Sequence, residues 1–133
     1  MQKESFRIVD ANFNRAREGL RVCEDIMRFI YSKSDSALKL KKTRRSLSLI
    51  IAQLSREELL KRRDLRADKG KFRYAKGSKF RYDDILRFNF QRVTEALRVL
   101  EEVSQVLKPQ LKQKFMRLRF KVYDIEKDSF AAI

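Results

Sequence analysis

Apolar residues recur every three or four positions along most of the chain, a pattern typical of amphipathic helices. The first stretch places its apolar side chains on one face when successive residues turn by about 100°, and it predicts a helix over about residues 5–31. Ser34, Asp35 and Ser36 offer turn and N-cap chemistry, so we expect a second helix to begin there and to continue to about residue 54.

Two further helices are predicted in the second half of the chain. Helical periodicity resumes near residue 83, continues to about residue 107 and breaks at Lys108 and Pro109. Proline fits the first turn of a helix, where its missing N–H is not needed, so a last helix is expected from Pro109 onward. The intervening stretch, residues 56–82, is very basic and repeats Lys-Phe-Arg-Tyr at 71–74 and 79–82. Its alternating polar and aromatic residues are compatible with a short hairpin or with an ordered loop.

The chain contains an internal repeat. A shift of 77 positions aligns residues 8–25 with residues 85–102, and nine of the 18 aligned positions are identical. A weaker match at a shift of 73 sets Leu38 against Leu111 and Arg44 against Arg117. Each half is therefore expected to be a helical hairpin, over about residues 5–55 and 83–128. Two hairpins related by a pseudo-twofold axis predict an all-α fold, a single domain (1–133) that is an antiparallel four-helix bundle with an excursion at 56–82.

Composition narrows the classes of function. The chain has 133 residues with 3 Gly and 1 Pro, which suits one packed domain, and it has no His, which excludes imidazole chemistry. Cys23 has no second cysteine to pair with, so we expect it to be a small buried apolar residue in a reducing compartment. No run approaches the roughly 20 apolar residues that span a bilayer, and a cytoplasmic protein is expected. The net charge of +15 favours phosphate-bearing partners, whether nucleic acid, anionic lipid or a small metabolite.

The repeat carries the polar residues of greatest interest. Each copy places an amide in the middle of the apolar face, an arginine at its edge and a glutamate slightly further round: Asn12, Arg15 and Glu18, then Asn89, Arg92 and Glu95. Two interpretations stay open. These groups either stabilise the bundle internally, with the amides bonded to backbone and each arginine paired with its glutamate, or they line a polar ligand site within the bundle.

Two further groups of charged residues have weaker assignments. The repeat also preserves an outer set that is expected to face solvent as ion pairs: Arg21, Glu24, Arg98 and Glu101.

The basic excursion gathers cations, two carboxylates and a glycine within eight residues: Arg63, Asp64, Arg66, Asp68, Lys69 and Gly70. Such a group can hold a phosphate together with Mg²⁺ on Asp64 and Asp68, or it is merely a solvated basic loop. The Lys-Phe-Arg-Tyr pair can stack on single-stranded nucleic acid, but such rings more often pack on the protein body.

Five motifs, taken together, resemble a known family. They are RIVDANFNRAREGLRVCED at 7–25, TRRSL at 43–47, RDLRADKG at 63–70, NFQRVTEALRVLEE at 89–102 and FMRLRFKVYDIEK at 115–127. In this order they are similar to the small helical domain often fused in front of thiamine-phosphate synthase, a family regarded as an alternative hydroxymethylpyrimidine-phosphate kinase. The resemblance covers nearly the whole chain. It implies ATP-dependent phosphorylation of hydroxymethylpyrimidine phosphate to the diphosphate, with ATP and Mg²⁺, in thiamine biosynthesis.

The resemblance and the repeat together suggest roles for individual residues. Asn12 and Asn89 would contact the aminopyrimidine or lie at the axis, and four arginines would bind phosphate oxygens: Arg15, Arg92, Arg44 and Arg63. Gly70 would supply backbone groups at the same site. Four carboxylates would hold Mg²⁺ or orient those arginines: Glu18, Glu95, Asp64 and Asp68. Two positions depart from the family's pattern, since Arg45 stands where relatives tend to have His and Lys69 where they tend to have Val.

Other classes of function stay open. The domain is either the kinase or a non-catalytic module that binds a pyrimidine phosphate or docks on thiamine-phosphate synthase. A basic bundle that binds nucleic acid is the less favoured alternative. Because the sequence ends at Ile133, we expect a free-standing protein without the synthase barrel and its activity. An apolar-rich bundle with a repeat could also form a homodimer.

Overall fold

The computed structural model describes residues 2–54 and 79–133, and these residues form four α-helices and two short helical turns. α1 spans Gln2–Asp25 and continues into a π-helical turn, η1, at Ile26–Ile30, and α2 spans Ser34–Ile51. α4 spans Tyr82–Leu107, the short turn η3 spans Pro109–Leu111, and α5 spans Lys112–Ala132. All four predicted helices are confirmed, and Pro109 begins the turn that leads into the last one.

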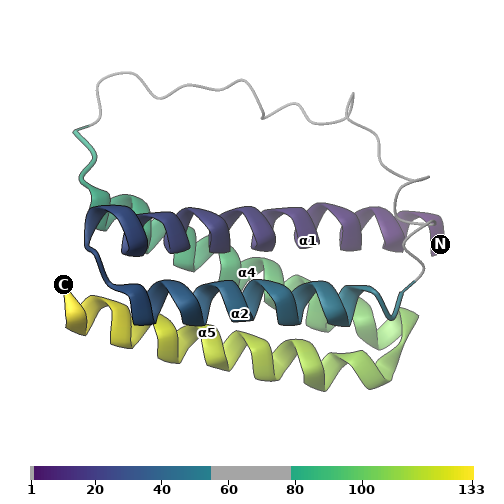
Figure 1. Cartoon of the computed structure of the whole chain (residues 1–133). Helices are drawn as coiled ribbons and strands as arrows, with labels where there is room; N and C mark the ends of the chain where they lie inside the picture. The colour runs from purple at the N-terminus through teal and green to yellow at the C-terminus, as the bar shows by residue number, and fades with distance from the viewer. Residues whose placement is uncertain (1, 55–78) are drawn as a thin grey trace.

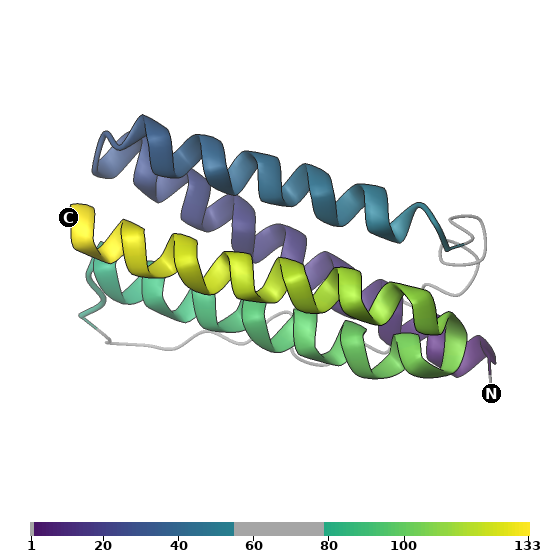
Figure 2. The same cartoon turned by 90° about the horizontal axis from the view of Figure 1, so that it is seen from below.

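The helices pack as a bundle in which the neighbours follow the order α1, α2, α5, α4 (Figure 1). α1 and α2 form one hairpin, α4 and α5 form the other, and the two bends lie at opposite ends of the bundle (Figure 2). α1 is antiparallel to α4, and this pair makes the most extensive contact between helices, whereas α2 and α5 make the least extensive of the four. The described residues thus form the all-α, pseudo-twofold arrangement that the repeat predicts, with the axis passing between α1 and α4.

Apolar side chains from all four helices fill the interior. The largest fully buried ones are Leu20, Met27, Leu40, Leu47, Leu86, Phe90, Leu97, Leu100, Leu111 and Phe115. Burial of one such side chain stabilises the fold by about 1.5–3 kcal/mol. The apolar face predicted for residues 5–31 also includes Ile8 and Ile30, but these two side chains are 43% and 45% exposed. Ile8 lies at the edge of that face, and Ile30 closes the π-helical turn, whose wider spacing moves it off the regular helical progression.

A tight turn connects α1 to α2. Lys33 donates its backbone N–H to the carbonyl oxygen of Met27 at 2.8 Å, and Ser32 between them has a φ of 55°. A serine in this left-handed region costs about 1–2 kcal/mol relative to ordinary backbone. α2 begins at Ser34, its N-cap residue is Lys33, and no side chain caps it. The predicted N-cap role of residues 34–36 is therefore wrong, because the turn closes before them and they lie inside the first helical turn.

The two halves match by different shifts in their first and second helices. α1 and α4 follow the shift of 77, and most of their buried positions coincide. α2 and α5 match at a shift of 75, where six buried positions pair: Ser36/Leu111, Leu40/Phe115, Thr43/Leu118, Leu47/Val122, Ile50/Ile125 and Leu54/Ser129. The predicted shift of 73 is wrong, because it aligned similar residues without regard to burial and set the exposed Leu38 against the buried Leu111.

α1 and α4 come close together at Gly19. A Cβ atom at this position would lie 2.7 Å from Cγ2 of Val93 and 3.2 Å from the backbone oxygen of Asn89, so a larger residue forces a displacement. In the repeat, Gly19 corresponds to Ala96, and Val93 corresponds to Ala16. One side of the axis therefore sets glycine against valine, and the symmetry sets alanine against alanine on the other side.

The remaining predictions concern the middle of the chain, and most of the residues involved are outside the part that the structure describes. The excursion at 56–82 and its possible hairpin are described only from residue 79, where residues 79–81 lead into α4. The start of α4 is stabilised by Asp84, whose carboxylate accepts a hydrogen bond from the backbone N–H of Arg81 at 3.1 Å. None of the described helices is both long enough and apolar enough to cross a membrane.

Candidate functional site

A groove of about 530 Å³ opens between α1 and α4 at the pseudo-twofold axis. Five residues from each helix line it, and every one corresponds to a residue of the other helix at the shift of 77: Asn12 and Asn89, Arg15 and Arg92, Glu18 and Glu95, Gly19 and Ala96, Val22 and Val99. The two copies of the repeated motif therefore build one symmetric groove from equivalent faces of the two helices.

The two asparagines of the groove are held by their own helices. Nδ2 of Asn12 donates to the carbonyl oxygen of Ile8 at 2.9 Å, and Nδ2 of Asn89 donates to that of Ile85 at 2.8 Å. The predicted pairing of these amides with backbone is confirmed, and it limits their rotation. Asn12 is 5% exposed and lines the groove, and among the described residues no group donates a hydrogen bond to its amide oxygen. That oxygen is left available as an acceptor at the groove wall.

The register of α1 against α4 decides which charged residues face one another. Gly19 lies against the turn of α4 that contains Asn89 and Val93. The two helices are antiparallel, so moving back along α1 from Gly19 to Arg15 corresponds to moving forward along α4 to about Glu95 (Figure 1). By the same count Glu18 lies opposite about Arg92. Across the axis, each arginine therefore faces the glutamate of the other copy of the motif.

The charged groups of the groove are open to a ligand. Arg15, Glu18 and Arg92 are exposed and make no ion pair with any described residue, while Glu95 accepts a hydrogen bond from Nε2 of Gln91 at 3.0 Å. The internal ion pair that the i,i+3 spacing suggested for Arg15 and Glu18 is absent from this part of the chain. Two guanidinium groups and two carboxylates thus surround a groove that can bind both anionic and hydrogen-bond-donating parts of a ligand.

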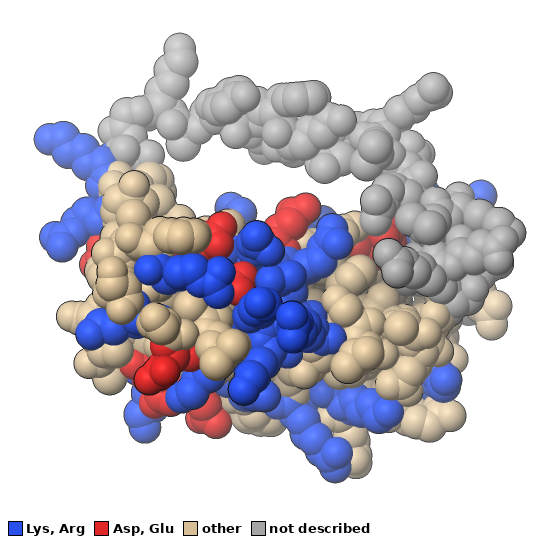
Figure 3. All heavy atoms as spheres, viewed as in Figure 1, with Lys and Arg blue, Asp and Glu red and all other residues tan. Residues whose placement is uncertain are grey.

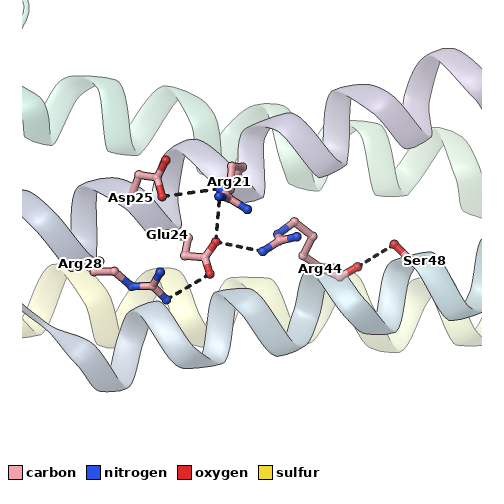
Figure 4. A network of polar contacts seen from close by, with 6 residues as sticks. All are labelled: Arg21, Glu24, Asp25, Arg28, Arg44 and Ser48. Carbon is pink, nitrogen blue, oxygen red and sulfur yellow. Dashed lines mark hydrogen bonds and ion pairs between the residues drawn. The ribbon is translucent and has the colours of Figure 1, made fainter.

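A second polar cluster lies between α1 and α2 (Figure 4). Its centre is Glu24, whose side chain is 2% exposed and whose carboxylate lies 3.2 Å from Nη2 of Arg44 and 3.3 Å from Nη2 of Arg28. Nε of Arg21 lies 3.8 Å from the same carboxylate and 3.6 Å from that of Asp25. Three guanidinium groups therefore surround one buried carboxylate, an arrangement that offsets its desolvation.

The equivalent carboxylate in the second half, Glu101, is also buried, and its partner Arg119 corresponds to Arg44 at the shift of 75. Arg119 from α5 donates to both of its oxygens, through Nε and, at 3.1 Å, through Nη2. This hydrogen bonding to Glu101 raises the pKa of Arg119 further above its ordinary value. The prediction that Glu24 and Glu101 face solvent is wrong, because the second helix of each hairpin supplies an arginine that pairs with the buried carboxylate. Arg21 and Arg98 are exposed, as expected.

Lysine and arginine side chains gather in the middle of the face that α1 and α2 present (Figure 3). The arginines of the cluster around Glu24 come from α1, from η1 that continues it and from α2 (Figure 4). They lie on a different side of α1 from the groove, because the groove residues of α1 face α4 whereas Glu24 faces α2. The excess of positive charge attracts anions to the molecule as a whole.

Cys23 is completely buried, as expected for a small apolar residue. Its Sγ lies 3.8 Å from the carbonyl oxygen of Leu86, and burial raises the pKa of the thiol well above its ordinary value. A protonated, inaccessible thiol is neither a nucleophile nor a metal ligand.

The structure brings six of the eleven predicted site residues into the groove: Asn12, Arg15, Glu18, Asn89, Arg92 and Glu95. Arg44 does not line the groove and instead pairs with Glu24. Four others lie outside the described residues, and with them the predicted Mg²⁺ site: Arg63, Asp64, Asp68 and Gly70. Within residues 2–54 and 79–133, no three carboxylates or thiols gather as a metal site would require. Four lining residues were not predicted from the sequence, namely Gly19, Val22, Ala96 and Val99, although the identity of the two valines in the repeat was a signal.

Comparison with known proteins identifies the family of the chain. A model of the ThiD2 family matches residues 7–128. The chain belongs to the ThiD2 family. The family resemblance drawn from the five motifs is thereby confirmed. The matched residues include most of α1, all of α2 and α4, and both copies of the groove motif.

Curated relatives of this ThiD2 family member carry the name thiamine-phosphate synthase. A protein of Nostoc punctiforme is 37% identical over 128 residues, which cover 95% of this chain and 35% of that protein. A Prochlorococcus marinus protein is 36% identical, and one from a Synechococcus strain is 39% identical, each over 120 residues. Those alignments cover 90% of this chain and 34% and 33% of the relatives, respectively. The chain thus spans about a third of the length of the relatives it matches. No solved structure matches it.

Proposed function

We propose that this ThiD2 family member phosphorylates hydroxymethylpyrimidine phosphate with ATP to give the diphosphate, in the groove between α1 and α4. The observation that carries the proposal is the lining of the groove, which holds two amides, two guanidinium groups and two carboxylates around the axis. The relatives named thiamine-phosphate synthase support a place in thiamine biosynthesis, since a third of their length is similar to this chain.

The proposed substrate has groups that match those of the groove. Its phosphate carries two negative charges and accepts paired hydrogen bonds from a guanidinium group such as that of Arg15 or Arg92. Its ring carries an amino group that donates to a carboxylate such as that of Glu18 or Glu95. Asn12 adds an amide oxygen at the wall of the same groove.

Phosphoryl transfer requires positioning and charge neutralisation more than it requires covalent chemistry by the protein. An oxygen of the substrate's phosphate attacks the γ-phosphorus of ATP, the bond from that phosphorus to the bridging oxygen breaks, and ADP leaves with the electron pair. Arg15 and Arg92 would neutralise the phosphates from the two sides of the groove. The Mg²⁺ that ATP carries would supply further positive charge at the same phosphates, while Glu18 and Glu95 would accept hydrogen bonds from the ring amino groups.

The decisive experiment mixes the purified protein with ATP, Mg²⁺ and hydroxymethylpyrimidine phosphate and follows the diphosphate by phosphorus NMR. We expect product with the unaltered protein and a fall in kcat/KM of at least about tenfold in Arg15→Met and in Arg92→Met, because each removes a charged phosphate contact. Arg98→Met is the matched control, since this arginine comes from the same motif but pairs with Glu102 on the outer surface. Turnover that survives both groove substitutions contradicts the proposal, as does a folded protein that forms no product.

The fusion seen in the relatives favours a second candidate function. The chain matches a third of proteins that are named as synthases, so in those proteins the domain is covalently joined to the rest of the enzyme. A module that binds pyrimidine phosphate and docks on thiamine-phosphate synthase would have the same groove without the transfer step. Sedimentation of the chain with a purified synthase, in the absence of any ATP turnover, would support this candidate over the kinase.

A further inference from the structure

We propose that the groove holds two composite half-sites, each made from both copies of the repeat: Arg15 of α1 acts with Glu95 of α4, and Arg92 of α4 acts with Glu18 of α1. One half-site takes the pyrimidine phosphate and the other takes the nucleotide. This inference rests on the proposed function and adds to it the way in which the two substrates are divided between the residues.

The register of the helices provides the first argument. Gly19 lies against Asn89 and Val93, so in the antiparallel pair Arg15 is level with about Glu95 and Glu18 is level with about Arg92. The valines follow the same order, because Val22 lies at the end of the groove that contains Asn89, and Val99 lies at the end that contains Asn12. Each end of the groove therefore presents an amide, an arginine, a glutamate and a valine.

The absence of internal pairing provides the second argument. Arg15 and Glu18 are three residues apart on one helix, a spacing at which opposite charges ordinarily pair. Within the described part of the chain they do not pair, and neither does Arg92 with Glu95. The groove keeps its charges separated in this way, whereas Glu24 and Glu101 are each neutralised by an arginine from a second helix.

The chemistry of the two substrates provides the third argument. Hydroxymethylpyrimidine phosphate and ATP share an aminopyrimidine ring, which in ATP is part of adenine, and both carry phosphate. Each composite half-site offers the same complement, namely a carboxylate for the amino group and a guanidinium for phosphate. Two such ligands related by the axis would approach each other at its centre, where the acceptor oxygen could meet the γ-phosphorus.

The test measures binding of each ligand separately by calorimetry, using hydroxymethylpyrimidine phosphate and a non-hydrolysable ATP analogue with Mg²⁺. Four single variants are compared: Arg15→Met, Glu95→Gln, Arg92→Met and Glu18→Gln. We expect Arg15→Met and Glu95→Gln to weaken one and the same ligand by about tenfold or more, with less than about a twofold effect on the other ligand. The other two variants should weaken the second ligand in the same way. Thermal melts establish that each variant is folded, and Arg98→Met should bind both ligands unchanged.

The outcomes separate this inference from the proposed function. If Arg15→Met and Glu18→Gln weaken the binding of the same ligand, each half-site is formed by a single copy of the repeat and the inference is wrong. If all four variants weaken both ligands equally, there are no separate half-sites, and the inference is wrong as well. Catalytic turnover in the unaltered protein would leave the kinase assignment intact in both cases. If binding follows the composite pairs but no phosphate is transferred, the half-sites stand and the kinase assignment fails.

Discussion

The contact of Gly19 with Val93 makes a quantitative prediction about stability. Replacing a helical glycine by alanine ordinarily gains about 1 kcal/mol. At Gly19 the new methyl group would lie 2.7 Å from Cγ2 of Val93, a fully buried side chain, and such overpacking costs about 1–3 kcal/mol. Gly19→Ala should therefore lower the free energy of unfolding by up to about 2 kcal/mol, or at best leave it unchanged.

The sign of the effect should change once Val93 is made smaller. Val93→Ala alone should cost about 2 kcal/mol, from two lost methyl groups and the space they leave. In that background Gly19→Ala fills the vacated space and gains helix propensity, so it should stabilise the protein by about 1 kcal/mol. The expected coupling between the two substitutions is then about 1–3 kcal/mol.

Urea unfolding of the four proteins, followed by circular dichroism, measures this coupling if the m-values agree. Ala37→Gly is the control, since Ala37 is a buried alanine of α2, a helix that lies diagonal to α4 in the bundle, and it should show no coupling to Val93. The reasoning is refuted if the effect of Gly19→Ala is the same in both backgrounds within about 0.5 kcal/mol, because the close contact would then carry no energy.

Three further predictions concern a buried ion pair, a buried thiol and a half-buried carboxyl group. Arg119→Met leaves the buried Glu101 without an ion-pair partner among the described residues, so it should lower the free energy of unfolding in urea by about 3–5 kcal/mol. Arg44→Met should lower it clearly less, because Glu24 keeps Arg21 and Arg28 as partners. Equal losses in the two variants would contradict this prediction. Cys23 should resist iodoacetamide at mildly alkaline pH until the protein unfolds, because burial raises the pKa of its thiol, and modification of the native protein detected by mass spectrometry would contradict this. Burial raises the pKa of Glu126, so the native state binds this proton more tightly and loses stability as the pH rises through the raised pKa. Glu126→Gln should therefore be more stable than the unaltered protein at neutral pH but not in acid. Parallel pH profiles of the two melting temperatures would contradict this prediction.

The helices and their pairing could be predicted because their signal is local. The apolar spacing of α1 and α4 extends over six or seven turns, and the repeat at a shift of 77 requires the two hairpins to have the same shape. The bonding of the two asparagines was predicted for the same reason, since an asparagine in the middle of an apolar face needs a partner, and in both copies that partner is the backbone one turn earlier.

The errors concern partners that come from another helix. On a helical wheel of α1, Glu24 lies at the edge of the apolar face, and nothing on that helix shows that Arg44 of α2 will cover it. Glu101 is covered in the same way by Arg119, which is 18 residues away in the sequence. The shift between α2 and α5 was misjudged because it matched identical residues of different burial, such as the exposed Leu38 and the buried Leu111, and residue identity alone does not constrain packing. The facing of Arg15 and Glu95 likewise depends on the register of two packed helices.

At the axis a glycine packs against a valine on one side and an alanine against an alanine on the other, and this difference in size affects which hairpins can pack together. A first hairpin paired with its own copy would set Gly19 against Ala16 and leave space on both sides, whereas a second hairpin paired with its own copy would press Ala96 against Val93 twice. Only the mixed pair has one glycine facing one valine and one alanine facing another. The duplicated hairpins thus behave as complementary subunits within one polypeptide, and the four residues that let them pack together also disfavour self-association of either hairpin.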